Sequence, residues 1–176
     1  MIDALTGVLI IPAIGAGLLA ALPGYRLTAR LNVLVALLTF LAALSLFVVE
    51  PRSGSYLLVD DFNKVFIVLT TFVGFTTSVF SASYIGHEIE IGRLTPTFVR
   101  FYHAMYQALM FAMNLALVAN NIGLMWVAIE MATLTTVLMV GIYRTHEALE
   151  AASSWAASAS RWRCSARSSS TWRRAR

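Results

Sequence analysis

The sequence predicts an all-α integral membrane protein with five transmembrane helices. Of its 176 residues, 59% are hydrophobic and only 12% are charged, and the mean hydropathy is +0.74. Soluble domains contain about 45–50% apolar and about 25% charged residues, so this composition excludes a soluble globular protein. Apolar runs of about 20 residues, the length that crosses a bilayer, recur along the chain between short polar segments.

The five expected spans follow one another along residues 1–152. The first contains Pro12 and several glycines, which membrane helices tolerate because neighbouring groups satisfy the freed backbone. The acidic start at Asp3 and the PGYR exit disfavour a signal peptide. Lys64 lies at the mouth of the third span, where its ammonium group can reach the interface. The expected spans are residues 4–22, 31–49, 62–85, 102–119 and 122–143.

The basic residues between the spans predict an N-terminus on the outside. Connections on the cytoplasmic side of a membrane carry an excess of Lys and Arg. With the N-terminus outside, the outer connections hold only Arg52 and Lys64, and the inner ones hold Arg26, Arg30, Arg93, Arg100 and Arg144.

One carboxylate, Glu130, lies deep in an apolar run, WVAIEMATLTTVLMVGIY at residues 126–143. A charge at membrane depth costs roughly 3 kcal/mol on insertion scales. Such a residue is usually retained for function, and a purely structural hydrogen bond between helices rarely needs an ionisable group. We therefore predict that Glu130 transfers protons.

The fourth span carries a polar stripe of His103, Gln107, Asn114 and Asn121, spaced 4, 7 and 7 residues apart. At about 100° per residue, these positions share one helix face. A tight turn joins the fourth and fifth spans, so we expect them to pack antiparallel, with the stripe facing Glu130. The stripe is interpreted either as a hydrated polar lane for protons or as interhelical hydrogen bonds, worth roughly 0.6 kcal/mol each.

The chain has no nucleotide motif, no metal cluster and no nucleophile–base pair. Cys164 is its only cysteine, so no disulfide or thiolate cluster forms within the chain. We therefore assign it no catalytic site and no cofactor. Its expected partners are the lipid bilayer and other membrane subunits, not nucleic acid.

Residues 153–176, SSWAASASRWRCSARSSSTWRRAR, hold six arginines and no acid. One interpretation is an irregular or disordered basic tail that binds anionic lipid. The other is out-of-frame translation. If the serine codons are TCN, a one-base shift turns each of them into a Phe, Leu, Ile or Val codon, and every Trp into Leu, Met or Val. The shifted frame then encodes a sixth apolar span of about 20 residues.

The coding DNA distinguishes the two interpretations of residues 153–176. Sequencing from codon 145 onward is expected to show a shifted frame that encodes an apolar helix and then stays open for several hundred codons. A shifted frame that closes quickly would favour the basic tail.

The stretch NNIGLMWVAIEMATLTTVLMVGIYRTHEALEAA, residues 120–152, resembles the proton-conducting membrane subunits of respiratory complex I and group 4 hydrogenases. The pattern is W-x-x-x-E, a run rich in Leu and Thr, a basic residue and EALEAA. It is most similar to hydrogenase 4 component F. Residues 57–70, LLVDDFNKVFIVLT, resemble the family's loop that enters the third span.

The resemblance implies an antiporter-like subunit of about 14 helices with inverted repeats and broken helices. Redox chemistry would occur in partner subunits, and Glu130 would couple to a Lys on a later span that has no counterpart here. The chain would then be an N-terminal fragment holding part of the antiporter-like bundle, from the inner membrane of a bacterium or archaeon.

Three functions remain open from the sequence. The first is a truncated membrane subunit of a proton-translocating hydrogenase or NADH:quinone oxidoreductase. The second is a subunit of a cation/proton antiporter of the same superfamily. The third is a small structural membrane protein with a basic lipid-binding tail.

Overall fold

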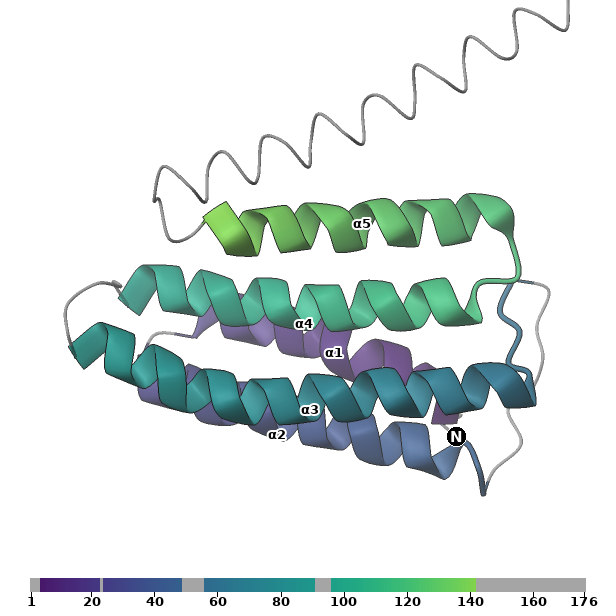
Figure 1. The fold of residues 1–176 in the computed structure, drawn as a ribbon, viewed down its shortest axis with the longest axis horizontal. Coiled ribbons are helices and arrows are strands. Elements are labelled where there is room, and N and C mark those ends of the chain that lie inside the picture. Colours follow the sequence, from purple (N-terminus) through teal and green to yellow (C-terminus); the bar gives the residue numbers. More distant parts are fainter. Residues whose placement is uncertain (1–3, 23, 49–55, 91–95, 142–176) are drawn as a thin grey trace, which may run out of the picture. The chain divides into compact units, whose positions relative to one another are not determined.

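The computed structural model describes residues 4–22, 24–48, 56–90 and 96–141, and these residues form five α-helices (Figure 1). The predicted all-α fold is confirmed. The expected tail, residues 153–176, lies outside the described residues. The helices are α1 Ala4–Ala21, α2 Tyr25–Ser45, α3 Asp61–Glu90, α4 Pro96–Val118 and α5 Ile122–Gly141.

Three helices begin before the predicted apolar runs, and α3 also ends later than predicted. Helix α2 starts at Tyr25 rather than residue 31, and α4 starts at Pro96 rather than residue 102. Proline is favoured in the first turn of a helix because its missing N–H would have no partner there. Hydropathy marks the part of a helix that lies in hydrocarbon, whereas backbone hydrogen bonding continues into the polar interface. The added turns carry charged residues such as Arg26 and Arg100.

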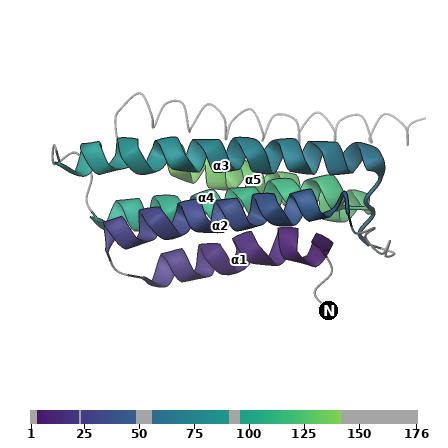
Figure 2. The same ribbon diagram turned by 90° about the horizontal axis from the view of Figure 1, so that it is seen from below.

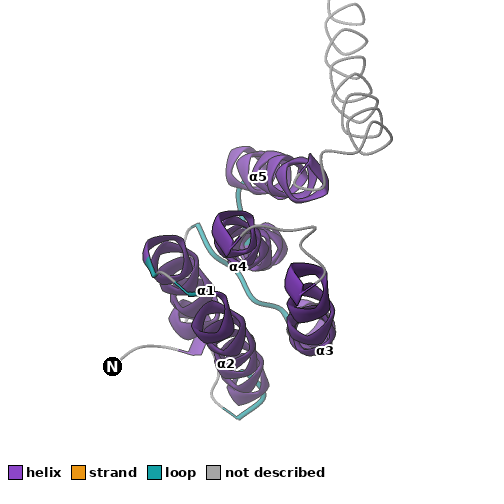
Figure 3. Ribbon diagram, turned by 90° about the vertical axis from the view of Figure 1, so that its left-hand side faces the viewer, coloured by secondary structure: helices purple, strands orange, loops and turns teal. Residues whose placement is uncertain are grey.

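Helix α4 is the central element of the compact unit formed by Met1–Thr136. It packs against α1, α2 and α3, and the remaining contacts pair α1 with α2 and α2 with α3. Figures 2 and 3 show these helices side by side from two further directions. Residues Val137–Arg176 form a second unit, whose described part is the end of α5.

An apolar core closes one end of the α1–α4 bundle. We call it the apolar cluster: Leu5, Val8, Leu9, Ala43, Leu46, Ile67 and Val118. Two backbone hydrogen bonds lie at the same end of the bundle. The Leu58 N–H donates to the Val118 carbonyl at 2.9 Å, and the Asn120 N–H donates to the Tyr56 carbonyl at 2.9 Å. These bonds join the segment before α3 to the turn between α4 and α5.

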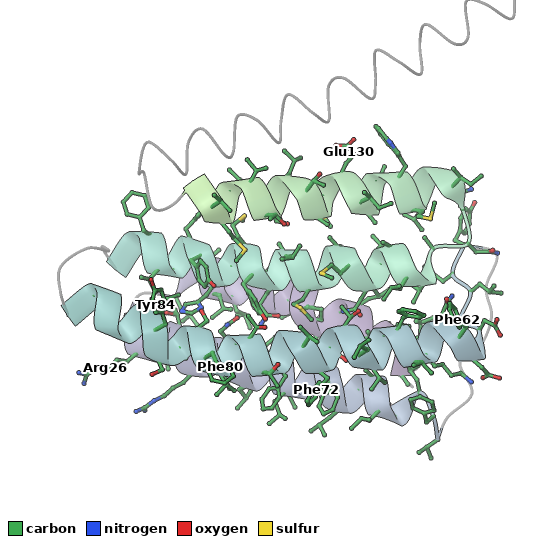
Figure 4. All side chains as sticks on the ribbon, viewed as in Figure 1. Arg26, Phe62, Phe72, Phe80, Tyr84 and Glu130 are labelled. Carbon is green, nitrogen blue, oxygen red and sulfur yellow. The ribbon has the colours of Figure 1, made fainter. Side chains whose placement is uncertain are left out.

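Four of the five helices, α1, α2, α3 and α5, are long and apolar enough to cross a membrane. Large hydrophobic side chains are exposed along them, and Phe72 and Phe80 project from α3 on the side away from α4 (Figure 4). Helix α4 is the exception among the described helices, because Arg100 and the stripe residues lower its hydropathy. Its central position keeps those polar groups away from lipid.

Gly15 allows α1 and α2 to approach closely. A Cβ added at Gly15 would lie 2.6 Å from Cγ1 of Val35, a β-branched side chain that cannot easily move aside. Gly15→Ala is therefore expected to lower the free energy of unfolding by at least about 1 kcal/mol. Unfolding in mixed SDS–lipid micelles, followed by circular dichroism, measures this loss.

Gly17→Ala is the matched control on the same helix. Within the described residues, no atom lies within 4 Å of a Cβ added there. Alanine at this position should leave the stability unchanged or raise it, because alanine favours helix more than glycine does. Equal losses from the two substitutions would contradict close packing at Gly15.

Candidate functional site

Three members of the predicted polar stripe lie on the buried face of α4. His103, Gln107 and Asn114 are all 0% exposed. They occupy the interior because α4 is surrounded by α1, α2 and α3. The helical spacing therefore predicted correctly that these three residues share one face.

The stripe meets a polar residue of α2, Asn32, which is also 0% exposed. Nε2 of Gln107 donates to Oδ1 of Asn32 at 2.8 Å and to the Asn32 backbone carbonyl at 3.2 Å. This pair of carboxamides holds α2 and α4 together inside the bundle.

Two tyrosines of α4 bind α3 beside the stripe. The Tyr106 hydroxyl donates to the Gly74 carbonyl, and Oγ of Ser81 donates to the Tyr102 hydroxyl at 3.1 Å. A Cβ at Gly74 would overlap the end of the Met110 side chain, so the missing side chain lets α3 and α4 approach each other. Polar contacts thus fix α4 to both α2 and α3.

Several polar atoms of this region have no hydrogen-bond partner among the described residues. Asn114 illustrates this, because its Nδ2 donates to the Met110 carbonyl at 2.8 Å while its Oδ1 accepts nothing. Both ring nitrogens of His103 are likewise buried and unpaired in the described structure. The full set is Asn32 Nδ2, His103 Nδ1, His103 Nε2, Gln107 Oε1 and Asn114 Oδ1.

Asn121, the fourth predicted member of the stripe, does not belong to it. Asn121 is exposed, and its Oδ1 accepts a hydrogen bond at 2.8 Å from the backbone N–H of Gly123. Helix α4 ends at Val118, so the helical spacing does not extend to Asn121. Its side chain instead satisfies a free N–H at the start of α5, as asparagine commonly does there.

Glu130 lies near the middle of α5 but does not face the stripe, and this part of the sequence prediction is wrong. The buried positions of α5 include Ala128 and Thr135, which share a helix face. Glu130 follows Ala128 by two residues, about 200° around the helix. Figure 4 accordingly shows Glu130 on the side of α5 away from α4. The short turn fixes the direction of α5 but not its rotation.

The Glu130 carboxylate has no ion-pair partner within the described residues. Its backbone carbonyl accepts a hydrogen bond from the Thr133 hydroxyl at 2.8 Å. The structure therefore joins Gln107 to Asn32 and places His103 and Asn114 on the same buried face of α4, whereas Glu130 lies apart from them.

Sequence reasoning missed Asn32, although a signal was present. Thr28, Asn32 and Thr39 are all buried, and their spacing of 4 and 7 residues repeats that of His103, Gln107 and Asn114. Two helices with the same polar spacing can present matching faces to each other. The repeated spacing could therefore have identified α2 as the neighbour of the stripe.

Comparison with known proteins shows which protein this sequence resembles. The chain is 60% identical over 148 residues to "Hydrogenase-4 component F homolog" from Methylacidiphilum infernorum (isolate V4). This relative confirms the predicted family resemblance. The match covers 84% of this chain but 31% of the relative, so the chain spans about a third of the length of that component F homolog. No family model and no solved structure matches the chain.

The similarity to component F and the apolar helices support the same conclusion about location. Four described helices have the length and composition of membrane spans, and the chain is similar to a hydrogenase component F homolog. The chain is accordingly an integral membrane protein. The name of the relative, a component, also implies a complex with other subunits.

Proposed function

We propose that the chain belongs to a membrane subunit that moves protons, coupled to redox chemistry in partner subunits. The observation that carries the proposal is Glu130, a carboxylate in the middle of the apolar helix α5 and on the face opposite its buried positions. The similarity to a hydrogenase component supports it.

The position of Glu130 favours proton transfer over a structural role. A carboxylate in hydrocarbon is stabilised by protonation or by a nearby cation. When a cation approaches, the carboxyl group releases its proton, and when the cation leaves, it takes one up. A group that changes protonation in this way can pass protons across the membrane in steps.

The cation that would approach the Glu130 carboxylate is expected to come from residues outside the described part of the chain. The only ion pair among them joins Lys64 to Asp61 at 2.7 Å, near the start of α3. The family resemblance implies a Lys on a later span of the subunit. The face of α5 that carries Glu130, opposite the buried positions of this helix, is where such a span would pack.

The proposed setting is the inner membrane of a bacterium or archaeon, with other membrane subunits of a hydrogenase or quinone oxidoreductase as partners. Electron transfer, and the cofactors that it needs, would belong to those partners. The contribution of this chain is a path for protons through its helices.

The full-length subunit tests this proposal within its complex. We expect inside-out membrane vesicles that contain the complex to take up protons when its redox substrates are added. Vesicles from a strain that lacks the subunit should keep redox activity but take up far fewer protons. Proton movement that needs Na⁺ or Li⁺ and no redox substrate would instead support the cation/proton antiporter.

A further inference from the structure

The buried polar side chains of α2 and α4 form a group that their own contacts do not satisfy. We call Asn32, His103, Gln107 and Asn114 the polar cluster. All four are 0% exposed, and together they present five polar atoms without a hydrogen-bond partner in the described structure. Native proteins leave few buried polar atoms unpaired, so five in one cluster indicate a bound ligand.

The chemistry of these atoms identifies the ligand. Asn32 offers an N–H donor, whereas Gln107 and Asn114 offer carboxamide oxygens as acceptors. A neutral His103 adds one donor and one acceptor. A bound anion would need hydrogen-bond donors alone, and a bound cation would need acceptors alone, whereas this cluster offers both. The described residues also bring together no group of three or more His, Cys, Asp or Glu that could hold a metal ion. Water both donates and accepts.

We propose that the polar cluster binds a file of ordered water molecules inside the α1–α4 bundle. Buried waters in proteins typically make about three hydrogen bonds to polar groups that lack other partners. His103 and Asn114 are separated by 11 residues, about 16 Å along α4, so the cluster needs several waters.

The apolar cluster closes the bundle just beyond the polar cluster, because Asn114 lies one turn before Val118 on α4. Asn32 and His103 lie two turns into α2 and α4, two helices that run in the same direction. The apolar cluster holds Ala43 and Val118, which lie three turns beyond Asn32 and Gln107 on the same helices. The proposed file of water therefore stops at the apolar cluster.

This inference goes beyond the proposed function, because it requires no proton movement. Glu130 lies on the opposite face of α5 and is not part of the hydrated group. The water site can be present whether or not Glu130 transfers protons, so the two proposals fail independently.

Cysteine substitution tests the water site. In a Cys164→Ser background, Asn32→Cys and Gln107→Cys place a thiol in the polar cluster. Ala43→Cys and Val118→Cys are the matched controls, each 11 residues further along the same helix and 0% exposed. The full chain in lipid nanodiscs is incubated with silver ion, which reacts with the thiolate, and the remaining thiols are counted with a maleimide after denaturation.

The thiols at the two polar-cluster positions are expected to react at least about tenfold faster than those at the control positions. Apolar burial raises the pKa of a control thiol, and a rise of one unit removes about nine-tenths of its reactive thiolate. Equally slow reaction at all four positions would overturn the proposal.

A second measurement needs no substitution inside the polar cluster. In solid-state NMR, magnetisation from water should reach the His103 ring nitrogens at least about tenfold faster than it reaches the backbone amides of Ala43 and Val118. Hydration of the site brings water within hydrogen-bond distance of the ring. Transfer to His103 as slow as transfer to those amides would show a dry interior and contradict the proposal, even if a cysteine variant failed to fold.

Discussion

Glu130→Gln is expected to lower proton translocation by the full-length complex at least about a hundredfold, the lower range for loss of a group that transfers protons. Glutamine keeps the size and hydrogen bonding of a protonated glutamic acid but cannot release a proton. Since Glu130 lies on the face of α5 opposite Ala128 and Thr135, the substitution leaves the contacts of these two residues in place. Assembly with partner subunits should therefore survive. Proton uptake by vesicles and co-purification of the subunits measure the two effects.

Two further variants make the Glu130 test specific. Glu130→Asp keeps an ionisable group and should retain part of the activity. Thr133→Val removes a hydroxyl group one turn away, whose hydrogen bond within the described residues goes to the Glu130 backbone carbonyl, and should leave pumping unchanged. Normal pumping by Glu130→Gln would rule out proton transfer through this carboxylate. Loss of assembly in that variant would indicate a structural role instead.

The sequence predicts the helices of this protein well because each apolar run must supply its own backbone hydrogen bonds in lipid. Hydropathy locates the middle of each helix but not its ends. Helix α3 runs through Asp61–Glu90 and α4 begins at Pro96, so both extend beyond the apolar residues. Helical hydrogen bonding does not stop at the edge of the hydrocarbon, and only capping or proline residues mark that boundary in the sequence.

The candidate site is predicted in part, for a related reason. Helical spacing shows which residues share a face, and it placed His103, Gln107 and Asn114 together. It does not show which helix that face meets. The stripe faces Asn32 rather than Glu130, because α4 is surrounded by the three preceding helices. The choice of neighbour depends on packing across the bundle, which a single-helix pattern does not contain.

Gln107→Met is expected to lower the free energy of unfolding by about 1–2 kcal/mol, because the hydrogen bond that Gln107 donates to the buried Asn32 carboxamide oxygen is lost. Asn32→Leu should cost a similar amount, since Gln107 then loses the side-chain acceptor at 2.8 Å. The double variant should lose less than the sum of the two, by about 1 kcal/mol, because no unpaired group of the pair remains.

The control for this cycle is Leu109→Met, a change of similar size on α4 at a half-buried apolar position. It should cost less than about 1.5 kcal/mol alone and add independently to Asn32→Leu. Reversible unfolding in mixed SDS–lipid micelles gives all the free energies needed. Additive losses from Asn32→Leu and Gln107→Met would mean that their hydrogen bond does not couple α2 to α4. A double variant that loses less than the sum would show that the Asn32–Gln107 hydrogen bond helps to select α2 as the neighbour of α4. Apolar packing alone would not then account for that choice of neighbour, which the sequence pattern of a single helix does not determine.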